Sequence, residues 1–284
     1  MSEESFNQSQ ESFFVQNQMA VPKATQGIFE LPCGYLSPEG ELVTEVKVRE
    51  ITGIEEDMLA AKNIPSGKKV TQLITNCLER LGTITDKTEL ANCVRSLMIG
   101  DRVFLMLAIR RVTLGDDFPF EAKCNECDKK NLFSINLAEL EVKTTVNRNK
   151  RVFDVVLPSG KPARWHVMTG KEEESLSKFQ NLDQLSLSIL VRVDLLDGQP
   201  TDMDTIKSLN MKDRNFLREE CFNVEEGGIE TEMDLQCPAC GEGFKTELDV
   251  GQTGFFFPSR VQKNSKRSTS SFSKPGKDTP TPNS

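Results

Sequence analysis

The sequence predicts an α+β protein built from an internally duplicated unit, with the two copies in a pseudo-twofold arrangement around a zinc-ribbon-like core. Three observations lead to this prediction. Two Cys-x-x-Cys turns, at Cys124 and Cys127 and at Cys237 and Cys240, lie far apart in the chain. Alternating apolar and polar residues flank both turns, as in β-hairpins. Four sequence markers, the turns included, occur twice in the same order, which is typical of a duplicated unit.

Residues 1–24 are rich in Ser, Gln, Glu and Asn, which favours a disordered tail. The alternative is a docking peptide whose Phe13 and Phe14 insert into a partner. Alternating residues from 28 to 51 then predict a β-hairpin. A helix follows from Thr52, because its spacing to Glu55 is that of a capping box.

The helical periodicity predicts a second helix over residues 70–81 and a third over residues 101–112. The third is apolar on all sides, so we expect it to be buried. A hairpin with the first Cys-x-x-Cys turn at its tip completes this unit.

The second half repeats these markers in the same order, so each unit is expected to contain a hairpin, helices and a knuckle hairpin. The matched segments are 31–34 and 157–160 (Leu-Pro-x-Gly), 52–56 and 169–173 (Thr-Gly-x-Glu-Glu), 96–102 and 208–214 (Ser-Leu to Asp-Arg), and the two Cys-x-x-Cys turns. The predicted divisions are a polar tail over 1–24, a first repeat over 25–145, a second repeat over 146–258 and a disordered basic tail over 259–284.

Each Cys-x-x-Cys turn directs two thiolates to one point, so the two turns supply the four soft ligands of one tetrahedral site. The predicted ligands of one structural Zn²⁺ per chain are Cys124, Cys127, Cys237 and Cys240. The metal would then join the two units. The chain has a single histidine, which leaves little scope for imidazole ligands.

Redox chemistry and unliganded thiols are the alternatives to zinc. A thioredoxin-type dithiol begins a helix after a strand, whereas both turns here lie between alternating stretches. Gly241 after the second turn can adopt the left-handed conformation, and Asp128 has the matching place after the first. If the turns lay far apart, each would need two more ligands. The remaining cysteines, all expected in the core, are Cys33, Cys77, Cys93 and Cys221.

Composition limits the class of protein. The chain has 284 residues, of which 37% are hydrophobic, and a net charge of −8. No secretory signal pattern and no apolar run of about 18 residues is present, so we expect a protein of a reducing cytosol without a membrane span. The tail from 259 carries +5, which leaves −13 on the rest. An acidic body repels phosphate, so nucleic-acid binding is disfavoured.

Enzymatic activity is also disfavoured, and no small-molecule substrate is expected. The sequence has neither a phosphate-binding glycine loop nor a Gly-x-Ser-x-Gly elbow. A closed four-thiolate site leaves zinc no open position for water. His166 beside Trp165 is expected to be a packed or edge residue. The acidic pairs at 55–56 and 172–173 and the Asp-Arg pairs at 101–102 and 213–214 are interpreted as helix-start residues.

The run of three phenylalanines at 255–257 either closes the core over the second hairpin or stays exposed as a contact patch. The candidate partner contacts are Phe13, Phe14, Phe255 and Phe256.

The repeated Leu-Pro-x-Gly, Thr-Gly-x-Glu-Glu, Leu-x-x-x-Asp-Arg and Cys-x-x-Cys motifs, followed by Phe-Phe-Pro at 256–258, resemble the baseplate hub assembly chaperones of T-even-type, contractile-tailed bacteriophages. The resemblance covers residues 28–258. It implies a phage protein in the host cytoplasm that helps to build the tail baseplate hub through contacts with hub or tail proteins. The alternatives are a structural component retained in the virion and a zinc-ribbon nucleic-acid adaptor.

Overall fold

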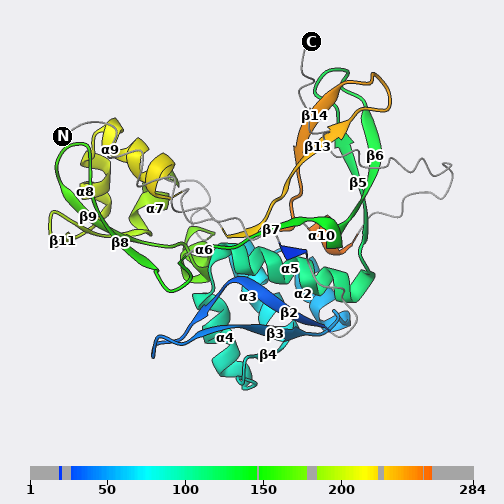
Figure 1. Ribbon diagram of the computed structural model, residues 1–284, viewed down its shortest axis with the longest axis horizontal. Helices are drawn as coiled ribbons and strands as arrows, with labels where there is room; N and C mark the ends of the chain where they lie inside the picture. Colours follow the sequence, from blue (N-terminus) through cyan, green and yellow to red (C-terminus); the bar gives the residue numbers. More distant parts are fainter. Residues whose placement is uncertain are drawn as a thin grey trace, which may run out of the picture.

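The computed structural model consists of two small α/β units and a pair of hairpins, arranged around one long helix, α5 (Ile99–Leu114) (Figure 1). The structure describes residues 19–20, 27–145, 147–177, 184–222, 227–251 and 253–257. Residues Phe104 to Arg111 of α5 are all buried. The predicted burial of this helix on all sides is confirmed. The helix begins at Ile99, two residues before the predicted start.

The first unit contains a three-stranded antiparallel sheet in the order β2-β3-β4, with β2 at Ile28–Leu36, β3 at Leu42–Val48 and β4 at Leu78–Leu81. The predicted hairpin is therefore present. The other helices of this unit are α2 (Gly53–Ala60), α3 (Ser66–Cys77) and α4 (Lys87–Ser96).

The predicted helix over residues 70–81 is wrong at its end, because α3 stops at Cys77 and the chain continues as β4. Leu78 and Leu81 are both fully buried, and their spacing of three suits a helix. In the structure β4 pairs with β3, and the register of this pair shifts between Lys47 and Val48 of β3. Both leucines of β4 are buried beside this irregularity. A bulge of this kind breaks the two-residue period of a strand, which explains the misleading pattern.

The second unit contains a four-stranded sheet in the order β11-β10-β9-β8. Its strands are β8 (Val152–Val156), β9 (Pro162–His166), β10 (Val193–Leu196) and β11 (Gln199–Pro200). Its helices are α6 (Gly170–Leu176), α7 (Gln184–Leu190), α8 (Met203–Ser208) and α9 (Met211–Asn215), followed by a π-helical segment at Phe216–Cys221. The core of this unit includes Trp165, which stacks on Phe153 at 4.6 Å between ring centroids.

Both predicted capping boxes are present at the starts of α2 and α6. The Glu55 carboxylate accepts from the Thr52 backbone N–H at 2.9 Å, and Glu172 accepts from the Thr169 N–H at 2.8 Å. In each pair the threonine hydroxyl also donates to the same carboxylate oxygen. Arg49 forms an ion pair with Glu55 at 2.9 Å and lowers the pKa of this carboxyl to about 2.

We expect Thr52→Ala and Thr169→Ala each to lower the free energy of unfolding by about 1 kcal/mol, as is typical for the loss of an N-cap side chain. Urea unfolding of the two variants checks this. Unchanged denaturation midpoints for both would mean that the two hydroxyls do not stabilise the helix starts.

Asp101 and Asp213 both lie in the first turn of a helix, as expected, and each has a second role that the sequence did not show. Asp101 is fully buried, and its carboxylate accepts from the Cys33 backbone N–H at 2.7 Å. Asp213 is also buried and accepts from the Ser159 N–H at 2.9 Å. Each aspartate therefore ties the Leu-Pro-x-Gly turn of its own unit to a helix.

The two arginines have matching partners as well. Arg102 donates to the Val94 carbonyl and to the Thr71 hydroxyl, both at 3.0 Å. The corresponding Arg214 donates to the Ile206 carbonyl at 2.9 Å and to the Ser186 hydroxyl at 3.0 Å. Each arginine thus joins three helices within its unit, which explains why both are buried.

The two units contact each other through α6, which packs against α3, α4 and α5. Arg102 reaches across to Glu173 at 2.6 Å, and the Thr71 hydroxyl donates to Glu174 at 2.7 Å. Gly100 approaches the second half so closely that a Cβ there would lie 1.7 Å from the Gly227 carbonyl oxygen. The two halves therefore have direct contacts of their own, apart from the cysteine turns.

A third small sheet, β1-β7-β12, brings distant parts of the chain together: β1 is Met19–Ala20, β7 is Glu141–Lys143 and β12 is Gly228–Ile229. A short 3₁₀ turn at Leu137–Glu139 precedes β7. In the described part of the chain, no helix is long and apolar enough to cross a membrane.

The phenylalanine run lies at α10 (Thr253–Phe256), beside α5. Phe255 and Phe256 are only 1% and 4% exposed, and Phe255 packs on Phe118 at 5.2 Å between centroids. The Phe255 carbonyl also accepts from buried Arg110 at 3.0 Å. These two side chains close the core. The prediction that Phe255 and Phe256 are exposed partner contacts is therefore wrong. Phe13 and Phe14 lie outside the described residues.

Candidate metal centre

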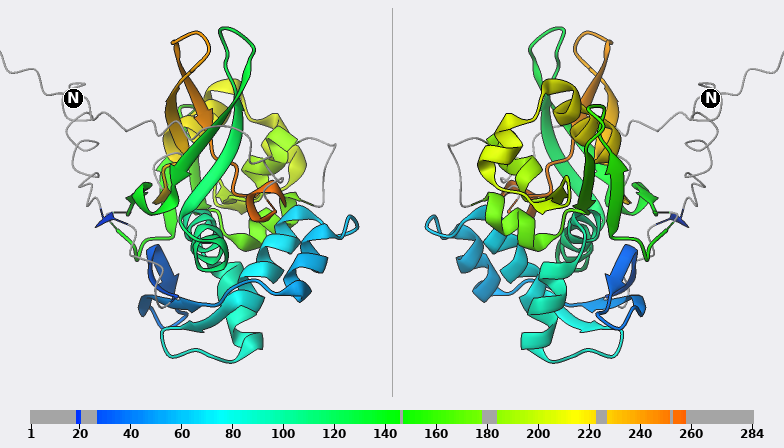
Figure 2. Two further views of the ribbon diagram at one scale, coloured as in Figure 1. Left: turned by 90° about the vertical axis from the view of Figure 1, so that its right-hand side faces the viewer. Right: turned by 90° about the vertical axis from the view of Figure 1, so that its left-hand side faces the viewer.

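Two antiparallel hairpins form an arm that extends from the body, and both views in Figure 2 show them side by side. The first hairpin consists of β5 (Asp117–Lys123) and β6 (Lys130–Asn136), and the second of β13 (Glu232–Gln236) and β14 (Gly243–Glu247). Each has a continuous register up to its Cys-x-x-Cys turn. The predicted knuckle hairpins are therefore present.

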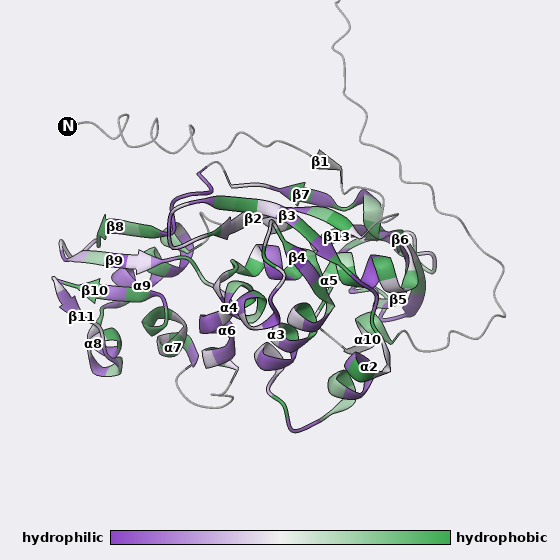
Figure 3. Ribbon diagram, turned by 90° about the horizontal axis from the view of Figure 1, so that it is seen from below, coloured by the Kyte–Doolittle hydropathy of each residue, from purple (hydrophilic) through white to green (hydrophobic). Residues whose placement is uncertain are grey.

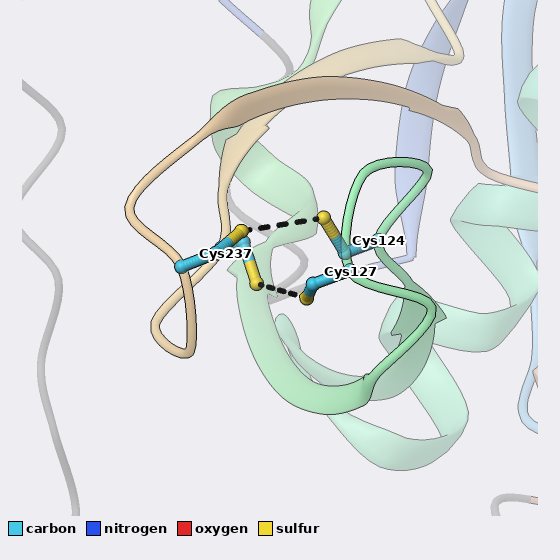
Figure 4. Close-up of side chains that lie close together, drawn as sticks. Cys124, Cys127 and Cys237 are labelled. Atoms are coloured by element: carbon cyan, nitrogen blue, oxygen red, sulfur yellow. Dashed lines mark hydrogen bonds between the residues drawn. The ribbon is translucent and has the colours of Figure 1, made fainter.

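The two turns meet, and their four sulfur atoms all lie within 4.8 Å of one another (Figure 4). Cys124 Sγ is 3.8 Å from Cys240 Sγ, and Cys127 Sγ is 3.7 Å from Cys237 Sγ. The other four cysteines are buried elsewhere in the fold, as expected. The four cysteines of the turns could hold one metal ion.

The spacing of the sulfur atoms tests whether they fit a tetrahedral ion. With metal–sulfur bonds of about 2.3 Å, as for zinc, the edge of a tetrahedron of sulfur atoms measures about 3.8 Å. The two short Sγ–Sγ distances, 3.7 and 3.8 Å, match this edge, and the upper limit of 4.8 Å for the others requires a contraction of no more than about 1 Å. Four thiolates are also the donor set that zinc prefers in closed structural sites.

Each turn is held by a residue in the left-handed conformation, as the sequence indicated. Asp128 has φ of 59° and Gly241 has φ of 82°. Their backbone N–H groups donate to the carbonyls of Cys124 and Cys237, at 3.1 and 2.8 Å. These hydrogen bonds close each turn, and the two thiols of each turn join the same cluster.

Hydrogen bonds also favour a thiolate at Cys237. Burial of its sulfur opposes ionisation, but the backbone N–H groups of Cys240 and Ala239 outweigh it, so that the pKa of Cys237 lies below its ordinary value. The side-chain amide of Asn131 donates to the same sulfur at 3.4 Å. Sequence reasoning missed Asn131, because its partner is 106 residues away in the chain.

Burial has the opposite effect on the core cysteines. It raises the pKa of Cys77 to about 12 and raises the pKa of Cys33 well above its ordinary value. Both remain protonated at neutral pH, and a metal requires a deprotonated thiol. Within the arm, contacts with the other three sulfur atoms raise the pKa of Cys240 while that of Cys237 is lowered, as expected when neighbouring thiols share one negative charge.

A small apolar cluster supports the arm, separate from the main core. Phe133 of β6 contacts Phe244 of β14 with 5.9 Å between ring centroids, and it contacts Phe120 of β5 at the same distance. Aromatic pairs of this kind contribute roughly 0.5–1.5 kcal/mol beyond the burial of their area. The two hairpins therefore have a contact of their own beside the cysteine cluster.

His166 lies apart from the cysteines, at the end of β9. Its Nδ1 is 2.9 Å from the Asp194 carboxylate and its Nε2 is 3.7 Å from Glu172. The hydrogen bond with Glu172, together with Asp194, raises the pKa of His166 although burial opposes this. The residue is partly packed, as expected, but the sequence did not reveal its two carboxylate partners.

We expect His166 to stabilise the fold only while it is protonated. A raised pKa means that the folded state holds the proton more tightly, so the contribution is complete below about pH 6.5 and is lost as the pH rises through the raised pKa. The difference in unfolding free energy between the wild type and His166→Gln should therefore shrink towards higher pH. Proton NMR of the chain's single imidazole gives the pKa directly. A pKa below that of a model histidine would contradict this assignment.

The fold and the arm define a class: an α+β protein that carries a cluster of four cysteines, shared by two hairpins from different halves of the chain. A comparison with protein families identifies the family to which the chain belongs. The family of the T4 bacteriophage base plate protein matches residues 30–248, and the chain belongs to this family. The matched region includes both Cys-x-x-Cys turns. No curated protein and no solved structure matches the chain.

Proposed function

We propose that the protein assists the assembly of a phage tail baseplate hub by binding hub or tail proteins, without catalysing a reaction. The observation that carries this proposal is the family match, which extends over both halves of the chain and both turns. The protein would act in the host cytoplasm during assembly. The chaperone role comes from the resemblance of the repeated motifs to baseplate hub assembly chaperones.

We further propose one structural Zn²⁺ per chain, bound by Cys124, Cys127, Cys237 and Cys240. The support is the short Sγ–Sγ separations and the all-thiolate donor set. The ion would neutralise the thiolates and hold the two hairpin tips together. Because all four ligands come from the protein, the ion would have a structural role.

Internal duplication is part of the proposal, with the repeats at 25–145 and 146–258 between tails at 1–24 and 259–284. Its support is the common strand order, since β2-β3-β4 and β8-β9-β10 each place a hairpin beside a later strand. The matching hydrogen bonds of Arg102 and Arg214 support it as well. Each repeat would then contribute half of the metal site.

A nucleic-acid adaptor is the less favoured candidate on charge. Residues 117–136 and 232–247, which form the two hairpins of the arm, contain eight acidic and four basic residues, a net charge of −4. Proteins that grip phosphate backbones need clusters of Lys and Arg. The arm is thus better suited to contacts with protein.

Complementation of a phage that lacks this gene tests the proposed function. Cells that supply the wild-type protein should yield complete baseplates, and cells that supply Cys127→Ser should yield fewer. An assembly chaperone should also be absent from purified virions. Recovery of the protein in virions at a fixed copy number would instead assign it to the structural components.

A further inference from the structure

The hairpin of β8 and β9 differs from its counterpart in the first unit in charge. The segment 147–166, which includes the five residues before β8 and three basic residues among them, contains five basic residues and one acidic residue, a net charge of +4 in a chain of −8. The corresponding segment 21–48 contains two basic and four acidic residues, a net charge of −2. We call residues 147–166 the basic hairpin.

The outer faces of the two sheets differ in a second way. In the first sheet, ion pairs between neighbouring strands cover this face: Lys47 with Glu79 at 2.9 Å, and Arg80 with Glu45 at 2.7 Å. A solvated sheet face typically looks like this. In the basic hairpin, Val152 and Val156 are 48% and 67% exposed. Figure 3 shows β8 as the outermost strand of its sheet, with apolar residues along it.

A hollow of about 390 Å³ lies on this exposed side of the second sheet. Its apolar lining comes from all three neighbouring strands, and the Asp154–Arg164 ion pair, with 2.8 Å between the charged atoms, crosses it. The apolar side chains on the exposed side are Val156, Pro162 and Leu195, whereas Val155 and Ala163 belong to the core of the unit beneath. The hollow has room for an aliphatic side chain.

The backbone of β8 offers a second element of recognition. In the part of the chain that the structure describes, β8 pairs with β9 alone and forms the end of its sheet. The outward N–H and C=O groups of such an edge can pair with an added strand, which is a common mode of peptide recognition. The exposed Lys150 and Lys161 lie near the two ends of this edge.

We infer that the edge of β8 is a docking surface for an extended, acidic segment of a partner protein whose apolar side chains alternate with carboxylates. Backbone hydrogen bonds would add the segment to the sheet, one apolar side chain would enter the hollow, and the carboxylates would face the basic residues. A second copy of this chain fits poorly, because pairing two β8 edges brings two hairpins of +4 together. This inference rests on the proposed function, which makes another tail protein the partner.

A defined peptide tests this surface on the full chain. The probe is a labelled ten-residue peptide in which Glu and Val alternate, and the control peptide has Lys in place of Glu. By fluorescence anisotropy we expect saturable binding of the acidic peptide and at least about tenfold weaker binding of the control. Binding should weaken as salt is raised, and NMR shifts of backbone amides should centre on residues 152–156.

Two matched variants complete the test. Val156→Asp should weaken binding at least about tenfold, whereas Glu30→Ala at the corresponding position of the first hairpin should leave it unchanged. Both sites are exposed, and thermal unfolding confirms that each variant is folded. Equal affinity for the two peptides, or an unaffected Val156→Asp, would overturn the inference.

Two further results would also overturn it. About tenfold stronger binding after deletion of residues 1–18, which carry three glutamates, would assign the edge to the chain's own N-terminal segment. A wild-type dimer that Val156→Asp dissociates in sedimentation velocity would assign it to a second copy. Because the peptide assay needs no phage, its failure leaves the complementation result, and with it the proposed function, standing.

Discussion

Replacing Cys127 with serine is expected to lower bound zinc from about one equivalent per chain to nearly none. Cys237→Ser, in the other half of the chain, should have the same effect. The reason is that the four sulfur atoms lie within 4.8 Å of one another, so that two turns share one site and neither turn holds an ion alone. Elemental analysis of the purified variants measures this.

Cys93→Ala is the matched control, because Cys93 is a buried thiol outside the arm. It should retain the full metal content. If Cys127→Ser kept half an equivalent of zinc, the two turns would be binding metal independently.

Loss of the ion should loosen the arm more than the body. Structural zinc sites contribute roughly 10–16 kcal/mol of binding free energy in small peptides, comparable to the stability of a whole domain, about 5–15 kcal/mol. The body keeps its own contacts between α6 and the first unit. Hydrogen exchange should therefore rise first in β5, β6, β13 and β14.

Arg102→Ala is expected to lower the free energy of unfolding by about 3–5 kcal/mol, the range for breaking a buried ion pair. Arg102 is 1% exposed and pairs with Glu173 of the other unit at 2.6 Å. Its removal also leaves the Thr71 hydroxyl and the Val94 carbonyl without this donor. Urea unfolding measures the loss.

Arg214→Ala is the matched control, because Arg214 has equivalent partners within the second unit. Of the two arginines, Arg102 forms the ion pair that crosses between the units. We therefore expect Arg214→Ala to cost less, and we expect Arg102→Ala to separate the unfolding of the two units. Equal losses would show that the pair with Glu173 contributes little.

Local sequence signals predicted much of this molecule. A Cys-x-x-Cys turn and a capping box each depend on residues three positions apart, so Cys124 with Cys127 and Thr52 with Glu55 could be recognised directly. The burial of α5 followed from a long apolar stretch, although the helix extends two residues further at each end than predicted. The meeting of the two turns was predicted from the metal's need for four ligands, and the sulfur positions agree.

Features that depend on distant partners could not be predicted in this way. The partner of Asp101 is the Cys33 N–H, 68 residues away, so the motif showed only a helix start. The run of phenylalanines was compatible with both a core and a contact surface, and the position of α10 against Phe118 shows that Phe255 is buried. The strand β4 was mistaken for helix because an irregular register buries both of its leucines.

X-ray absorption of the purified full-length protein is the most direct test of the shared metal site. We expect one zinc ion per chain, surrounded by four sulfur atoms at about 2.3 Å and by no nitrogen or oxygen ligand. Two ions per chain, or a mixed sulfur and nitrogen or oxygen shell, would contradict a single site shared by Cys124, Cys127, Cys237 and Cys240.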